Sequence, residues 1–122
     1  MPLVALQLVL PPGSTPPRGL TQTVADALGK VLDCGPGQVW VRVGSISSTE
    51  YAENLVVVGE SELPVFVTLL HAELPPSEFR AAEALRVCEA IARCVGRQVE
   101  RVHLEYAPLG RGRLAFGGKL LE

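Results

Sequence analysis

The chain has 122 residues, of which 48% are hydrophobic and 20% are charged, and this composition suits one compact domain with an apolar core. Its formal net charge of −2 offers no basic surface for nucleic acid or an anionic membrane. The longest apolar runs cover about eight residues, which is too short to cross a bilayer. Three cysteines without metal-ligand spacing indicate reduced thiols and a cytoplasmic protein.

The first third of the sequence predicts a strand, a helix and a second strand. Residues 3–10 form an almost continuous apolar run, which is typical of a strand buried on both faces, and a proline-rich break follows it. Apolar residues at helical spacing predict a helix over residues 17–32, which a Gly-Pro-Gly turn ends. Residues 38–43 then alternate, with valines on one face and polar or aromatic residues, among them Trp40 and Arg42, on the other.

The rest of the chain repeats this order after a weaker middle section. The expected elements are a short strand over 55–58, a strand over 65–70 opened by Pro64, a helix over 77–95 with Ser77 as its N-cap, a strand over 101–106, and a glycine-rich loop or hairpin over 110–119.

The two halves match at a spacing of 62 or 63 residues. Pro2 and Pro64 each open an apolar strand, and Val39-Trp40-Val41-Arg42 matches Val102-His103-Leu104-Glu105. One domain made of two β-α-β halves, about 1–62 and 63–122, is therefore expected. Two such units predict an α+β fold, with a four-stranded mixed sheet and two helices on one of its faces. The uncovered face would carry apolar side chains, so self-association is expected.

Three features coincide in this sequence: the repeated β-α-β unit, Pro2 directly after Met1, and the tail Phe116-Gly117-Gly118-Lys119-Leu120. With them the whole chain resembles the tautomerase superfamily, whose longer members are fused pairs of this length. Val41-Arg42-Val43 and Tyr51-Ala52-Glu53-Asn54 look most like the 5-carboxymethyl-2-hydroxymuconate isomerase group. The resemblance implies a tautomerase/MIF-like fold, a homotrimer whose sheets line a central barrel, a small anionic carboxylate substrate, and no cofactor.

The resemblance also implies that Pro2 is the catalytic base. Removal of Met1 would leave Pro2 as a secondary amine, and an apolar site near cations disfavours the charged form, which lowers the pKa of the amine. The amine would take a proton from an unsaturated 2-oxo or 2-hydroxy acid and return it at another carbon. The alternative is that the proline only begins a strand, where its missing N–H costs nothing. A retained Met1 would make Pro2 an amide without basicity.

An anionic substrate needs cations at its site. Arg42, on the polar face of its strand, is the first candidate, and Arg111 and Arg113 lie in a glycine-rich loop that can approach a carboxylate. Each has the alternative of a solvated surface charge. Trp40 is expected to wall an apolar pocket or a subunit contact.

The remaining polar candidates have structural interpretations. His103 fits a surface or interface position, His71 ends an apolar strand, and Tyr106 lies on the apolar face of its strand. The sequence has no metal-type cluster, phosphate loop or nucleophile–base pair.

Two further hypotheses stay open. Gly110-Arg111-Gly112-Arg113 looks more like the tail of the superfamily's decarboxylases. This favours decarboxylation or hydrolytic dehalogenation, with a protonated Pro2 as acid. The other hypothesis is a non-catalytic, ferredoxin-like binding or assembly domain on a similar frame.

Overall fold

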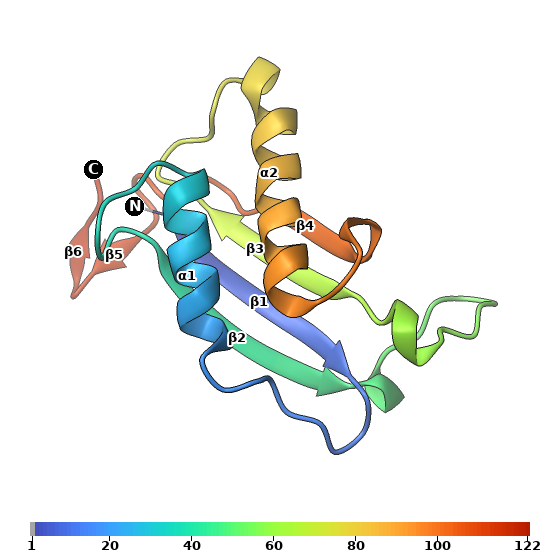
Figure 1. Cartoon of the computed structure of the whole chain (residues 1–122). Coiled ribbons are helices and arrows are strands. Elements are labelled where there is room, and N and C mark those ends of the chain that lie inside the picture. The colour runs from blue at the N-terminus through green and yellow to red at the C-terminus, as the bar shows by residue number, and fades with distance from the viewer. Residues whose placement is uncertain (1) are drawn as a thin grey trace.

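Two β-α-β units form the body of the protein in a computed structural model that describes residues 2–122 (Figure 1). The elements in chain order are β1 (Leu3–Leu10), α1 (Leu20–Val31), β2 (Trp40–Ser47), β3 (Val65–Leu70), α2 (Ser77–Val95), β4 (Val102–Tyr106), β5 (Ala115–Phe116) and β6 (Lys119–Leu120). The fold is α+β, as the sequence predicts.

The four long strands form one mixed sheet in the order β2-β1-β3-β4. Each β-α-β unit contributes a parallel pair, β1 with β2 and β3 with β4, and the central pair β1 and β3 is antiparallel. Both helices lie against the same face of the sheet (Figure 1), which confirms the predicted layering. Over the opposite face, called here the open face, the described residues place no helix.

Alternation along the strands divides the side chains between the two faces. Toward the helices, β1 and β3 bury residues such as Val4, Leu69 and Val67, which pack against Val24 and Ile91 of the helices. Burial of this apolar area is the main stabilising term of the fold. The open face is more exposed, and Trp40 and Phe66 on it are 48% and 36% accessible.

The register of the sheet fixes how the two halves correspond. Leu3 lies opposite Trp40 in the first parallel pair, and Phe66 lies opposite His103 in the second, so the halves match at a spacing of 63 residues. The counterpart of Pro2 is therefore Val65, and the expected match of Pro2 with Pro64 is wrong by one residue.

Each β-α-β unit is followed by a small hairpin at an equivalent position. Glu53 bridges Val56 after the first unit, and Phe116 bridges Lys119 after the second, again 63 residues apart. The two hairpins lie at opposite ends of the sheet, with β5 and β6 close to the N-terminus (Figure 1). The predicted hairpin of the tail is confirmed. The repeat therefore extends beyond the β-α-β units themselves.

The predicted strand over 55–58 is wrong. Leu55 has a left-handed backbone with φ of 63°, and the side chains of Leu55 and Val57 are 101% and 98% exposed. A tight turn at Leu55 prevents an extended run, so the apolar composition of this segment does not reflect burial.

Two other boundaries also differ from the prediction. The strand expected over 38–43 runs to Ser47 as β2, because the full length of β1 pairs with it and overrides its polar composition. The helix expected from residue 17 begins at Leu20, after Gly19 with φ of 83°.

The helix over 77–95 is confirmed, with Gly96 in left-handed conformation at its end. Its N-cap is Pro76 rather than Ser77, which is the first helical residue. Within residues 2–122, no helix combines the length and apolar character that crossing a membrane requires.

Candidate functional site

A small apolar pocket lies between the start of the sheet and the C-terminal hairpin. Its volume is about 280 Å³, and its lining residues are Leu3, Val4, Trp40, Arg42, Leu114, Ala115, Phe116 and Gly117. The rings of Trp40 and Phe116 meet edge to face with centroids 5.1 Å apart, so they join β2 to the hairpin across the pocket. We call this space the hairpin pocket.

Pro2 lies at the strand end that the hairpin pocket occupies. It is buried, it directly precedes the lining residue Leu3, and its carbonyl oxygen accepts a hydrogen bond of 3.2 Å from the backbone N–H of Trp40. The Trp40 indole is itself fixed, because its Nε1–H donates to the carbonyl of Gly37 at 2.9 Å. Pro2 and Trp40 are thus held together by the backbone.

Arg42 brings positive charge to the same place. It lies two residues after Trp40 on the open face of β2, opposite Ala5 of β1. Among the residues that the structure describes, no carboxylate forms a salt bridge with Arg42, and no other charged side chain lines the hairpin pocket. A guanidinium at the rim of an apolar pocket suits an organic carboxylate.

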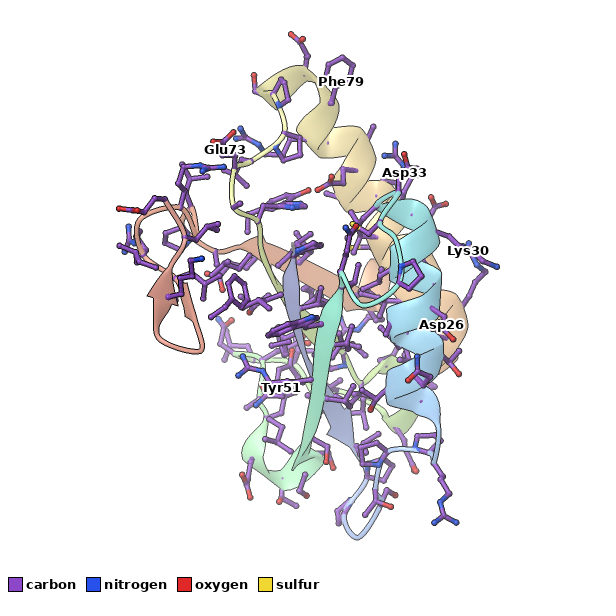
Figure 2. All side chains as sticks on the ribbon, turned by 90° about the vertical axis from the view of Figure 1, so that its left-hand side faces the viewer. Asp26, Lys30, Asp33, Tyr51, Glu73 and Phe79 are labelled. Atoms are coloured by element: carbon purple, nitrogen blue, oxygen red, sulfur yellow. The ribbon has the colours of Figure 1, made fainter. Side chains whose placement is uncertain are left out.

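The two loop arginines lie elsewhere. Arg111 is paired: its Nε lies 2.7 Å from Glu73 Oε1, and its Nη1 donates to the backbone carbonyl of Glu122. Figure 2 shows Glu73 in the segment before α2, beside the C-terminal hairpin. Arg113 is exposed and does not line the hairpin pocket. Arg111 therefore ties the hairpin to the body of the protein.

Gly110 is the second anchor of that hairpin. Its N–H donates to the carbonyl of His71 at 2.9 Å, and it is buried. A Cβ atom at this position would lie 2.9 Å from Leu70 Cδ2 and 3.2 Å from the His71 carbonyl oxygen. Only glycine permits this close approach, which brings Leu114 and Phe116 to the pocket.

At the other end of the sheet, the counterpart of the hairpin pocket is filled by polar and aromatic groups. Tyr51 donates to Glu53 at 2.6 Å, and Arg101 contacts the same carboxylate oxygen at 2.7 Å. The ring of Phe66 lies 5.8 Å from Tyr51 and 5.7 Å from His103. Figure 2 shows Tyr51 on the side of the sheet away from the helices. The two halves of the repeat therefore carry different groups at equivalent places: an apolar pocket at one end of the sheet and a polar cluster at the other.

A larger, shallower groove of about 970 Å³ runs beside α1 and the turn that follows it. Asp26, Lys30 and Asp33 border it (Figure 2). These charges lie on the helix side of the sheet, and the groove shares no lining residue with the hairpin pocket. Across residues 2–122, no group of three or more His, Cys, Asp or Glu residues is arranged to hold a metal ion.

The sequence predicts the candidates Pro2, Trp40 and Arg42, but it does not predict the pocket walls that the hairpin supplies. In the sequence, Phe116 is visible only as part of a glycine-rich motif. Its partner Trp40 lies 76 positions earlier, and no local pattern links them.

Comparison with known proteins identifies the architecture. No protein-family model matches the chain, and no curated protein sequence matches it significantly. Solved structures do match over nearly the full length. Pt0534 inactivated by 2-oxo-3-pentynoate superposes with a TM-score of 0.74 at 12% identity, covering 98% of this chain and 94% of that one.

Two further solved structures share this architecture. The macrophage migration inhibitory factor from Oncomelania hupensis gives a TM-score of 0.70 at 17% identity, covering 100% of this chain and 83% of that one. A fused 4-OT wild-type symmetric trimer gives 0.68 at 18% identity, covering 98% and 94%. The chain has the tautomerase/MIF fold. At these identities the likeness establishes the fold alone.

Proposed function

We propose that the protein is a cofactor-independent isomerase of the tautomerase superfamily, with Pro2 as its base. The observation that carries this proposal is the backbone link between Pro2 and Trp40 at an apolar pocket whose single charged lining residue, among those described, is Arg42. An amine buried against apolar groups has its protonated form disfavoured, which brings its pKa toward neutrality.

The proposed reaction moves one proton. The carboxylate of an unsaturated 2-oxo or 2-hydroxy acid binds Arg42, and its carbon chain lies against Trp40 and Phe116. The neutral Pro2 nitrogen removes a proton from one atom of the conjugated system, and the double bonds shift. The resulting ammonium returns the proton at another carbon. No oxidant or cofactor is required, because the electrons stay within the substrate.

The chemistry of a structural neighbour supports this substrate class. Pt0534 is inactivated by 2-oxo-3-pentynoate, a small 2-oxo acid. Within this class we propose 5-carboxymethyl-2-hydroxymuconate-like acids of aromatic catabolism as the first compounds to test. Arg113 is a secondary candidate for a distal carboxylate of such an acid, since it is exposed and directly precedes Leu114, which lines the pocket.

We also propose that the protein is a homotrimer assembled through the open face. Exposed Phe66 on this face and the symmetric trimer formed by fused 4-OT support this arrangement. Phe66→Glu should reduce the mass measured by light scattering to that of a monomer, whereas Phe79→Glu on α2 should not. Unchanged mass for Phe66→Glu would exclude an interface at this position.

A cytoplasmic location fits the proposed metabolic role. Cys34, Cys88 and Cys94 are all free thiols, which is the usual state in a reducing compartment.

The proposed function is tested by ketonisation of 2-hydroxymuconate-type dienols, followed by ultraviolet absorbance with untagged protein. The wild type should accelerate ketonisation, and Pro2→Ala should abolish the acceleration. An equal rate for Pro2→Ala and the wild type would exclude Pro2 as the base.

A further inference from the structure

Three side chains near the start of β1 form a connected network that the proposed mechanism does not use. His71 Nε2 lies 2.9 Å from Glu83 Oε1, and the Tyr106 hydroxyl donates to the same oxygen at 2.9 Å. The rings of His71 and Tyr106 are stacked, with centroids 6.2 Å apart. The side chains of His71 and Glu83 are only 14% and 13% exposed. The network therefore holds a carboxylate of α2 against the sheet.

The sheet register places this network beside Pro2. Leu3 and Leu70 are the last pair of the antiparallel ladder of β1 and β3. Continued by one residue, the same register would place Pro2 opposite His71. Side chains alternate along a strand, and Pro2 shares the helix-facing side with Val4. His71 occupies the same side, since it contacts Glu83 of α2. Directly opposed residues of an antiparallel pair have Cβ atoms about 5 Å apart.

Several titratable and charged groups meet at this network. The hydroxyl of Tyr106 comes from β4, His71 follows β3, and Arg80 and Cys88 of α2 act on Tyr106. Burial and the bond to Glu83 raise the pKa of the Tyr106 hydroxyl, so Tyr106 stays neutral and acts as a donor. Arg42, the cation of the hairpin pocket, lies on the open face, across the sheet from this network.

We infer that Glu83, through His71, is a positioning residue that stabilises the protonated form of the Pro2 amine and thereby sets the pH at which Pro2 becomes a base. This inference rests on the proposed function, because it needs Pro2 as a free amine. A carboxylate held close to an amine stabilises its protonated form and raises its pKa. The apolar hairpin pocket disfavours the protonated amine. The Glu83 carboxylate and the apolar pocket together therefore set the pH range in which Pro2 can act as a base.

The inference is tested by titrating Pro2 through its reaction with 2-oxo-3-pentynoate. The neutral nitrogen adds to the alkyne carbon β to the ketone, and its proton moves to the adjacent carbon, so the adduct keeps every atom of the reagent. The rate of adduct formation is measured by mass spectrometry of the N-terminal peptide over a pH series. The midpoint of the rate–pH curve gives the pKa of the Pro2 amine. The variants are Glu83→Gln and Tyr106→Phe, with Glu89→Gln on the exposed side of α2 as control.

Glu83→Gln keeps the hydrogen-bond acceptor and removes the charge, so the midpoint should fall by about half a pH unit or more. Tyr106→Phe removes a hydrogen-bond donor to the Glu83 carboxylate. The carboxylate charge is then less neutralised, so the midpoint of this variant should rise. Glu89→Gln should leave the midpoint unchanged. Opposite shifts in two neighbouring variants do not arise from a general loss of stability.

An unchanged midpoint in Glu83→Gln, or shifts of the same sign in both variants, would overturn the inference while leaving Pro2 as the base. Failure of the wild type to form an adduct at Pro2 at any pH would overturn the proposed function and this inference together.

Discussion

Trp40 and Phe116 meet edge to face with ring centroids 5.1 Å apart, although one belongs to the first β-α-β unit and the other to the C-terminal hairpin. The contact closes the wall of the hairpin pocket next to Pro2, whose carbonyl bonds the backbone of Trp40. Residues from both ends of the chain therefore lie at one pocket.

Loss of the Phe116 ring should open this pocket. Phe116→Ala should raise the KM for a dienol substrate and lower the free energy of unfolding by at least about 1 kcal/mol, because the aromatic pair and its buried area are lost. Steady-state kinetics and urea denaturation measure the two effects. Phe79→Ala, at an exposed site of α2 (Figure 2), is the control. An unchanged KM in Phe116→Ala would place substrate elsewhere.

Removal of the Arg42 charge should weaken substrate binding. A hydrogen bond to a charged group contributes about 1.5–3 kcal/mol, so Arg42→Gln should lower kcat/KM by about tenfold to a hundredfold. Arg42→Lys should recover part of the loss, since it retains the charge without the bidentate geometry. Arg86→Gln on α2 serves as control. Equal kinetics for the Arg42→Gln and Arg86→Gln variants would contradict a role in carboxylate binding.

A side chain at position 110 should displace the hairpin. Gly110→Ala puts a Cβ atom 2.9 Å from Leu70 Cδ2 and 3.2 Å from a backbone oxygen, so a loss of about 1–3 kcal/mol in stability is expected. The C-terminal segment should also become more sensitive to limited proteolysis. Gly59→Ala is a suitable comparison, because nothing lies within 4 Å of its Cβ position. Equal protease resistance in both variants would show that the anchor is dispensable.

The Glu53 cluster predicts an acid-sensitive contribution to stability. The hydroxyl of Tyr51 and the guanidinium of Arg101 hold the pKa of Glu53 below its ordinary value of 4.5. A lowered folded-state pKa gives stability that is present above the unfolded pKa and is lost as the pH falls through the folded value. Glu53→Gln should therefore lower the urea midpoint at neutral pH and flatten its decline below about pH 5. Glu60→Gln is the exposed control, and parallel pH profiles for wild type and Glu53→Gln would contradict this origin.

Much of the architecture was predictable because it depends on local patterns. The apolar run of β1, the stripe of α2 and the glycine-rich tail each follow from short-range periodicity or turn chemistry. Leu55 shows the limit of that approach: its apolar segment predicts a strand, but the chain turns at Leu55 and the segment forms a small hairpin instead.

The site was predictable only in part, for a similar reason. Trp40 and Arg42 could be placed with Pro2, since the repeat and the strand alternation are visible in the sequence. The role of Arg111 as a hairpin anchor depends on Glu73, and the network beside Pro2 depends on Glu83. Both contacts join residues distant in sequence, and sequence patterns do not specify such pairs.

The proposed mechanism requires Pro2 to be a free, reactive amine. Its most direct test is the intact mass of untagged protein before and after treatment with 2-oxo-3-pentynoate. We expect a chain shorter by its initiator methionine, which gains one equivalent of reagent at Pro2. A chain that retains Met1 and gains no adduct at Pro2 would exclude this mechanism, because an amide nitrogen can neither take a proton from the substrate nor add to the alkyne.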